Sequence, residues 1–192
     1  MSKLTIPDWL SISRIVMVPV VLLLAYFDLR MWCASLLLTG FITDALDGYL
    51  ARKWNITTAR GSRLDSTGDA LLFVAGVAAV FWFEWSFVKE HWLELAIALG
   101  LYFVQLGLAY WRYGKPSSFH TYSAKTAAVL QAVFLVCTLY FGPRDWLFYV
   151  ALAISILETV EEIILIFIYD EWVNNIKGLY WVMRDDLEAK RN

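Results

Sequence analysis

The sequence predicts an all-α integral membrane protein, and three observations lead to that fold class. Of the 192 residues, 60% are hydrophobic and 18% are charged, whereas an ordinary soluble domain is about 45 to 50% apolar. The hydrophobic residues fall into six long stretches, each close to the roughly 20 residues that cross a bilayer as a helix. The connections between the stretches are short, so we expect one membrane domain over residues 1–192.

The six predicted transmembrane helices follow one another along the chain, with interfacial segments at both ends. Hydrophobic and polar residues are interleaved over the first dozen positions, which predicts a short interfacial helix before the first span. The tail after Asp170 has a similar composition, with tryptophans among charged residues. The spans are expected at residues 9–27, 32–52, 66–84, 92–112, 124–141 and 146–169.

The distribution of charge predicts how these helices are oriented. Six spans place both termini on one side, and 13 of the 16 Lys and Arg residues lie there, which leaves Arg30, Lys89 and Arg144 opposite. Because cytoplasmic loops are enriched in Lys and Arg, both termini are expected in the cytoplasm, with the protein in a bacterial or archaeal cytoplasmic membrane. The formal net charge of -2 argues against nucleic acid as a partner.

Four aspartates gather at the predicted cytoplasmic ends of the second and third spans. Asp44 and Asp47 share one face of the second helix, and Asp65 and Asp69, four residues apart, share a face of the third. Converging carboxylates repel one another and need a cation. Without His or Cys nearby, these oxygen ligands favour Mg²⁺ or Mn²⁺ over zinc. Since protein-held Mg²⁺ usually completes its shell with water and substrate phosphate, the pattern predicts a phosphate-containing substrate.

The same face of the second helix carries small residues and one arginine. Gly48 and Ala51 expose backbone beside the carboxylates, and Arg52 offers a planar fork suited to phosphate or a base edge. Small residues on a membrane helix also serve close helix packing, so each alone favours a packing role. Their combination with four aspartates at fixed spacing favours a binding site.

Eight of these positions form the pattern D-x2-D-G-x2-A-R-x8-G-x3-D-x3-D, which resembles the signature of the CDP-alcohol phosphatidyltransferase family. The pattern runs from Asp44 to Asp69 and includes Gly61, and the opening IPDWLSISRI is also similar to the family. The resemblance implies transfer of a phosphatidyl or related phospho group from a CDP-linked lipid such as CDP-diacylglycerol to a small alcohol. CMP would be released by a homodimer whose site opens to the cytoplasm and the bilayer.

The resemblance also assigns roles to single residues. It implies two Mg²⁺ or Mn²⁺ ions, one held by Asp44, Asp47 and Asp65 and the other by Asp44, Asp65 and Asp69. Asp69 would in addition be the catalytic base that takes the proton of the acceptor hydroxyl. A two-metal clamp of this kind polarises a pyrophosphate on general grounds. The positions implied to contact the CDP moiety, or to leave room for it, are Gly48, Ala51, Arg52, Thr58 and Gly61.

Ionisable residues in the later spans are further candidates. Lys125 is similar to a fifth-helix lysine of the family and would meet an acidic acceptor or balance the carboxylates; alternatively it extends to the membrane interface as an anchor. Glu158, Glu161 and Glu162 lie in the sixth span and should face the protein interior rather than lipid. We expect Glu162 within ion-pair reach of Lys125 or lining the acceptor cavity.

The acceptor and two rival functions stay open at this point. Ser66 and Ala70 stand where glycerophosphate-using family members usually show a proline and a lysine, so the acceptor is not assigned. Aspartate-rich membrane prenyltransferases also bind diphosphates through Mg²⁺, but they normally need more spans than this chain provides. A small cation transporter lined by carboxylates would need acidic groups near the bilayer midplane, which only the sixth-span glutamates satisfy.

Overall fold

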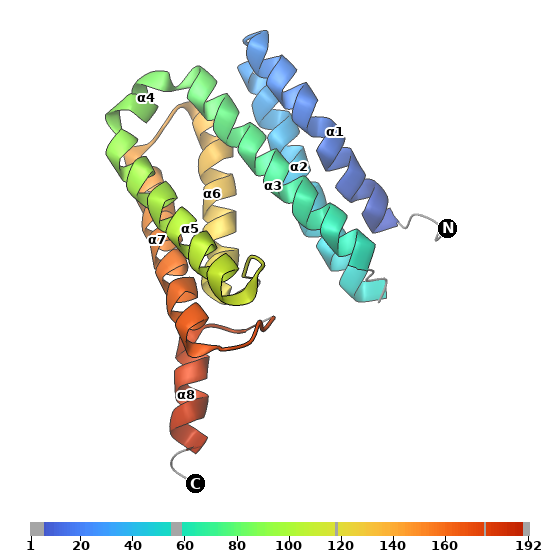
Figure 1. Ribbon diagram of the computed structural model, residues 1–192. Helices are drawn as coiled ribbons and strands as arrows, with labels where there is room; N and C mark the ends of the chain where they lie inside the picture. The colour runs from blue at the N-terminus through green and yellow to red at the C-terminus, as the bar shows by residue number, and fades with distance from the viewer. Residues whose placement is uncertain (1–5, 55–58, 118, 175, 190–192) are drawn as a thin grey trace. The chain divides into compact units, whose positions relative to one another are not determined.

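The computed structural model describes residues 6–54, 59–117, 119–174 and 176–189, and every regular element longer than a single bridge in these ranges is a helix (Figure 1). The predicted all-α class is therefore confirmed for the described part of the chain. Its helices are α1 (Ile6–Tyr26), α2 (Arg30–Trp54), α3 (Ala59–Phe83), α4 (Trp85–Glu90), α5 (Trp92–Tyr113), α6 (Tyr122–Phe141), α7 (Asp145–Ile168) and α8 (Leu179–Ala189).

Four of these helices are long and apolar enough to cross a membrane, and they make the chain an integral membrane protein. They correspond to the predicted first, third, fourth and fifth spans. Helices α2 and α7 have comparable lengths, 25 and 24 residues, but each carries more charged residues than the four apolar segments do. The six-span count is not confirmed. The four apolar segments are Asp8–Tyr26, Leu64–Phe83, Trp92–Tyr113 and Tyr122–Phe141.

The predicted layout differs from the structure in detail at the N-terminus and between the third and fourth spans. Helix α1 begins at Ile6 and continues to Tyr26 without a break, so the described residues hold no separate interfacial helix ahead of the first span. Asp8 in its first turn favours this start, because a carboxylate is stabilised near a helix N-terminus. Between the third and fourth predicted spans, the expected loop contains the six-residue helix α4, which buries Phe87 and Val88.

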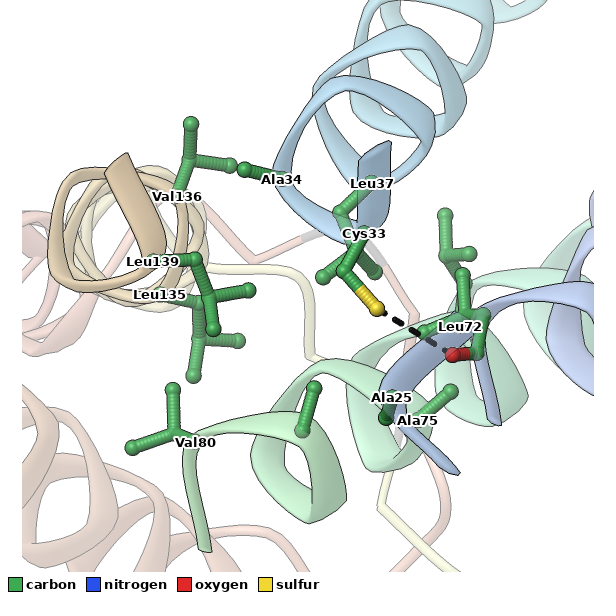
Figure 2. Close-up of a cluster of buried hydrophobic side chains, with 12 residues drawn as sticks. Ala25, Cys33, Ala34, Leu37, Leu72, Ala75, Val80, Leu135, Val136 and Leu139 are labelled. Carbon is green, nitrogen blue, oxygen red and sulfur yellow. Dashed lines mark hydrogen bonds between the residues drawn. The ribbon is translucent and has the colours of Figure 1, made fainter. Parts of the chain in front are cut away.

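The chain forms two compact units, and unit 1 comprises Met1–Lys89 and Ala132–Arg144. Within it α1, α2 and α3 lie side by side (Figure 1). Their core includes Leu37, Leu72 and Leu139 (Figure 2). The thiol of Cys33 donates to the backbone carbonyl of Val21 at 3.2 Å and so joins α2 to α1.

Arg30, at the start of α2, joins three helices of unit 1. Its guanidinium donates to the backbone carbonyls of Leu139 at 2.8 Å and Thr138 at 2.6 Å, in the last turn of α6. It also forms an ion pair with Glu84, directly after α3. The Thr138 carbonyl also accepts from the backbone N–H of Gly142 at 3.0 Å. Because helix-terminal carbonyls lack partners within their own helix, the bond to Leu139 satisfies a group at the end of α6.

Unit 2 comprises Glu90–Gln131 and Asp145–Asn192 and holds α5, the first half of α6, α7 and α8. Helix α5 ends at Gly114, whose φ of 68° lies in the left-handed region and whose N–H donates to the carbonyl of Tyr110. The backbone N–H of Ile176 donates to the carbonyl of Phe119 at 2.8 Å. This bond fastens the loop after α5 to the segment before α8, over a core that includes Leu165 and Ile166.

Candidate metal centre

Three carboxylates from two helices meet in unit 1. Asp44 comes from α2, and Asp65 and Asp69 come from successive turns of α3. One oxygen from each lies within 4.8 Å of the others. Their side chains are 38% to 41% exposed, so a ligand can reach them. The structure therefore brings together three of the four aspartates that the sequence placed at the ends of these helices.

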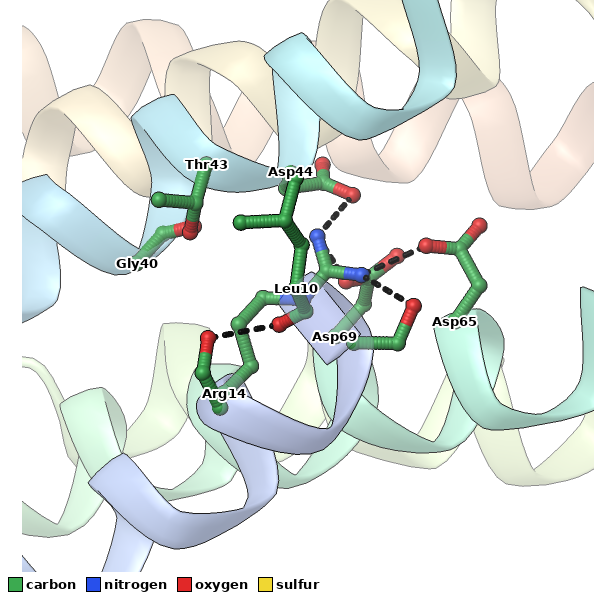
Figure 3. Close-up of polar contacts among 9 residues, drawn as sticks. Leu10, Arg14, Gly40, Thr43, Asp44, Asp65 and Asp69 are labelled. Carbon is green, nitrogen blue, oxygen red and sulfur yellow. Dashed lines mark hydrogen bonds and ion pairs between the residues drawn. The ribbon is translucent and has the colours of Figure 1, made fainter. Parts of the chain in front are cut away.

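Arg14 of α1 lies between the three carboxylates (Figure 3). Its Nη1 is 2.6 Å from Oδ1 of Asp44 and 3.2 Å from Oδ1 of Asp69. Its Nη2 is 2.5 Å from Oδ1 of Asp65. The side chain of Arg14 is 0% exposed. One guanidinium thus contacts carboxylates from both α2 and α3.

From the sequence, Arg14 was one of the 13 basic residues that predict the cytoplasmic side, and no role in the site was expected for it. A signal for its role was present, because a lone ionisable residue inside an apolar span is by default a functional candidate. Arg14 falls within the apolar segment Asp8–Tyr26 of α1.

Two glycines allow the three helices to approach this closely. A Cβ added to Gly68 would lie 3.1 Å from the backbone oxygen of Ser11 and 3.5 Å from Cβ of Arg14. A Cβ added to Gly40 would lie 2.4 Å from a methyl carbon of Leu72. The first contact joins α1 to α3, and the second joins α2 to α3. The leucine methyl group near Gly40 can move aside, whereas the backbone oxygen near Gly68 cannot move without the helix, so Gly68 is the glycine that allows α1 to lie close to α3.

Hydroxyl groups around the cluster are satisfied within their own helices. Ser13 donates to the carbonyl of Leu10 at 2.7 Å, and Thr43 donates to the carbonyl of Gly40 at 2.8 Å. These bonds direct both hydroxyls to the backbone rather than to the carboxylates.

The other predicted site residues lie mostly outside what the structure describes. Helix α2 continues to Trp54, so its backbone has the periodicity that would place Asp47, Gly48, Ala51 and Arg52 near the face of Asp44. The side chains of these four residues, and Thr58 altogether, are outside the described residues. Gly61 lies on α3, one turn before Asp65.

The chemistry of the donor set fits a hard divalent cation. All three ligand candidates are carboxylate oxygens, which Mg²⁺ and Mn²⁺ prefer. Arg14 neutralises one of the three negative charges and contacts Oδ1 of each carboxylate. With all three carboxylates ionised, the cluster would carry two formal negative charges, and each carboxylate has further lone pairs to offer.

A second polar cluster lies in unit 2 around Glu162 of α7. Gln105 of α5 donates to Oε2 of Glu162 at 2.5 Å, and Ser117 donates to the same oxygen at 2.6 Å. Glu162 is 8% exposed, so the prediction that it faces the protein interior is confirmed. No ion pair joins it to Lys125 in the part of the chain that the structure describes; Lys125 Nζ instead lies 5.5 Å from the ring centroid of Tyr122.

Glu161, the neighbouring glutamate, fixes the start of α8. One of its oxygens accepts from the backbone N–H of Leu179 at 2.7 Å, and the other accepts from the hydroxyl of Ser123. Gly178 has a φ of 146°, and a Cβ there would lie 2.9 Å from Oε1 of Glu161. The glutamate thus holds an otherwise unpaired helix N-terminal N–H and joins α8 to α7 and α6.

Basic residues surround a small pocket in the same unit. The pocket has a volume of about 180 Å³ and is polar in character. Lys125, at the N-terminal end of α6, contributes to its lining together with His120, Tyr122, Ile176 and Lys177. A pocket with two lysines suits an anionic group.

The comparison with known proteins agrees with the geometry of the carboxylate cluster. The sequence pattern that describes CDP-alcohol phosphatidyltransferases matches residues 4–157, which include Arg14, Asp44, Asp65 and Asp69. The chain belongs to the CDP-alcohol phosphatidyltransferase family. The resemblance drawn from the motif is thereby confirmed, and the carboxylate cluster lies within the part of the chain that the family shares.

Bacterial members of the CDP-alcohol phosphatidyltransferase family show similarity over part of their length. The CDP-diacylglycerol–glycerol-3-phosphate 3-phosphatidyltransferase of Sodalis glossinidius is 35% identical over 81 residues, 41% of this chain and 44% of the relative. That of Rickettsia bellii is 43% identical over 70 residues, 35% and 39% of the two chains. That of Yersinia enterocolitica is 37% identical over 89 residues, 42% and 49%. Each similarity spans less than half of the relative.

Proposed function

We propose that this protein transfers a phosphatidyl or related phospho-alcohol group from CDP-diacylglycerol to an alcohol, with release of CMP, in phospholipid biosynthesis. The observation that carries the proposal is the convergence of Asp44, Asp65 and Asp69 at a partly exposed position within the family's shared region. The relatives described above are named for CDP-diacylglycerol as donor, which supports the choice of lipid.

Two divalent ions, Mg²⁺ or Mn²⁺, complete the proposed site. Asp44, Asp47 and Asp65 would hold one, and Asp44, Asp65 and Asp69 the other. When bound, such a pair polarises the pyrophosphate and stabilises the charge that develops on the departing CMP. Asp69 is the proposed base, which takes the proton of the acceptor hydroxyl on a carboxylate oxygen. Its position one turn from Asp65 allows it to serve both purposes.

The proposed nucleotide subsite lies on the residues that follow Asp44. The position of α2 supports it, because the helix continues through these residues to Trp54. Arg52 would bind phosphate through its planar fork, and the glycines and alanine would leave room for the cytidine. The residues assigned to the CDP moiety are Gly48, Ala51, Arg52, Thr58 and Gly61.

The proposed acceptor is an anionic alcohol, and glycerol 3-phosphate is the first candidate because the relatives are named for it. Lys125 would bind its phosphate, which the basic lining of its pocket supports. Ser66 and Ala70 depart from the proline and lysine usual in glycerophosphate-using members. The acceptor therefore has to be identified from a panel rather than from one assay.

The proposed arrangement in the membrane follows the charge pattern. We propose six spans, with α2 and α7 crossing alongside the four apolar segments and keeping their carboxylates away from lipid. Both termini and the carboxylate cluster would face the cytoplasm of a bacterium or archaeon. Residues 1–192 would act as one domain within a homodimer.

The polar cluster of unit 2 favours this function over a carboxylate-lined cation transporter. Glu162 is the most buried of the α7 glutamates, and its Oε2 is already bonded to Gln105 and Ser117. A conduction path needs ligands that exchange readily with ions. The carboxylates of Asp44, Asp65 and Asp69 on α2 and α3 are instead about 40% exposed.

The test is a product analysis with the purified full chain in nanodiscs. The protein is incubated with labelled CDP-diacylglycerol, Mn²⁺ and one alcohol at a time: glycerol 3-phosphate, inositol phosphate, serine or glycerol. CMP release and the lipid formed are measured by mass spectrometry, with Asp65→Asn as the matched control. We expect one acceptor to give a phospholipid product and CMP. An absence of product with every alcohol would contradict the proposed function.

A further inference from the structure

We infer that Arg14 is a positioning residue that holds the carboxylates of Asp44, Asp65 and Asp69 in their metal-binding arrangement. The inference rests on the metal-dependent function proposed above. It assigns to α1 a direct part in a site whose ligands come from α2 and α3.

The contacts show how one side chain arranges three others. Arg14 uses Nη1 for Oδ1 of Asp44 and Asp69, and Nη2 for Oδ1 of Asp65. In each pair the contact is to Oδ1, and a carboxylate has further lone pairs with which to bind another ligand. Because the guanidinium is planar and rigid, it fixes the orientation of the carboxylates as well as their separation.

Charge repulsion explains why such an arrangement needs a fixed cation. Three carboxylates with oxygens within 4.8 Å of one another repel. Since their side chains are about 40% exposed, each could turn outward to water. Arg14 opposes that movement before any metal arrives, so the ligands are already gathered.

Burial explains why Arg14 stays in place when metal binds. Its side chain is 0% exposed and stays charged at any physiological pH. Moving it away from its carboxylates would leave a buried charge without compensation, which is strongly unfavourable. The guanidinium therefore shares the carboxylates with the metal, in the way that outer hydrogen-bond donors orient ligating carboxylates.

Gly68 gives independent support to this function of α1. It lies between Asp65 and Asp69, on the side of α3 that α1 approaches, at a position where a Cβ would meet the Ser11 oxygen at 3.1 Å. The glycine thus allows the backbone that carries Arg14 to lie directly beside the backbone that carries two of the ligands.

The test is the affinity of the full chain for Mn²⁺, measured by electron paramagnetic resonance in nanodiscs. Arg14→Gln should weaken Mn²⁺ binding about 10- to 100-fold, as loss of outer hydrogen-bond partners usually does. Arg14→Lys keeps the charge but loses the planar guanidinium with its two donor nitrogens, so Mn²⁺ affinity should fall less than in Arg14→Gln. Arg30→Gln is the control: Arg30 is another arginine of unit 1 that forms an ion pair, but it lies about four helical turns before Asp44, and its replacement should leave Mn²⁺ affinity unchanged.

Wild-type affinity in Arg14→Gln, or tighter binding, would overturn the inference. If Arg14→Gln does not fold, Arg14→Lys decides, and unchanged affinity there overturns it equally. Failure of the proposed function has a different signature, because the wild-type chain itself would then bind no Mn²⁺.

Discussion

Both compact units bring carboxylates together, but the carboxylates of the two units are satisfied in opposite ways. In unit 1, three aspartates share one arginine and are about 40% exposed. In unit 2, Glu162 is almost fully buried and accepts hydrogen bonds from Gln105 and Ser117. The first cluster keeps excess negative charge and open oxygens, whereas the bonds of the second stay within the protein.

This difference identifies the cluster of unit 1 as a candidate binding site and that of unit 2 as a structural hydrogen-bond network. A buried polar network that is fully hydrogen-bonded stabilises one packing arrangement. A cluster with more carboxylates than cations is stabilised by a further bound cation, by protonation of a carboxylate or by screening from water. An ionisable residue in a membrane helix therefore indicates function only after its partners are known.

Neutralising an aspartate of unit 1 should have the largest effect. Asp44→Asn, Asp65→Asn or Asp69→Asn keeps the side-chain shape and removes the anionic ligand, so CMP release should fall at least about a thousandfold if several kcal/mol of transition-state stabilisation are lost. Release of labelled CMP measures this. Asp170→Asn, which changes an exposed aspartate paired with Arg112, is the control and should retain activity. Near-normal turnover in any of the three variants would contradict the assignment of that aspartate to the metal site, and the cluster of unit 1 would then be structural, like that of unit 2.

Sequence reasoning reached the aspartates of unit 1 because their spacing repeats the helical period. Asp65 and Asp69 are one turn apart, and the structure places Asp44 beside them. Arg14 was missed because its role depends on how α1 packs against α3, and no spacing within α1 encodes that contact. The close approach is visible only once Gly68 is seen beside Ser11.

For the fold too, the sequence predicted the helices but not the contacts between them. Long apolar stretches predicted the helices of the first, third, fourth and fifth spans. The partner of Glu162 was not predictable, because Gln105 lies 57 positions away and meets it only through the packing of α5 on α7. Lys125 was expected as the partner because it lies in the preceding predicted span, and order along the chain does not determine contact between helices.

Removing a donor in unit 2 should reduce stability rather than metal binding. Gln105→Leu leaves the Glu162 carboxylate with one fewer hydrogen bond, and the free energy of unfolding should fall by about 1–3 kcal/mol. Thermal unfolding in detergent measures the loss, and Mn²⁺ affinity should stay at the wild-type value. A loss of Mn²⁺ binding without a loss of stability would show that the network of unit 2 belongs to the site.

Arg52→Lys should change the affinity for the nucleotide substrate. Lysine keeps the charge and loses the bidentate fork, and one charge-assisted hydrogen bond of about 1.5 kcal/mol corresponds to about tenfold in KM for CDP-diacylglycerol. The KM for the alcohol should change less. Steady-state kinetics with each substrate varied in turn measures both, and the reverse pattern would place Arg52 at the acceptor.

Gly68→Ala should have the smallest effect, because it moves a helix by a few tenths of an ångström and changes no charge. The added methyl group would meet the Ser11 oxygen at 3.1 Å, so α1 and Arg14 shift relative to α3. We expect Mn²⁺ affinity to fall a few-fold, or about 1 kcal/mol or less. Gly100→Ala is the control, since nothing lies within 4 Å of a Cβ there. Equal affinities in the two variants would show that the approach of α1 does not affect the ligands.

The most direct test of the account is an Mn²⁺ titration of the full chain, followed by electron paramagnetic resonance, with Asp65→Asn and Glu162→Gln alongside. Both variants replace a carboxylate with an amide of the same shape, one in each cluster. The account predicts two Mn²⁺ ions per wild-type chain, loss of that binding in Asp65→Asn and its retention in Glu162→Gln. Saturable binding that survives Asp65→Asn and disappears in Glu162→Gln would contradict it.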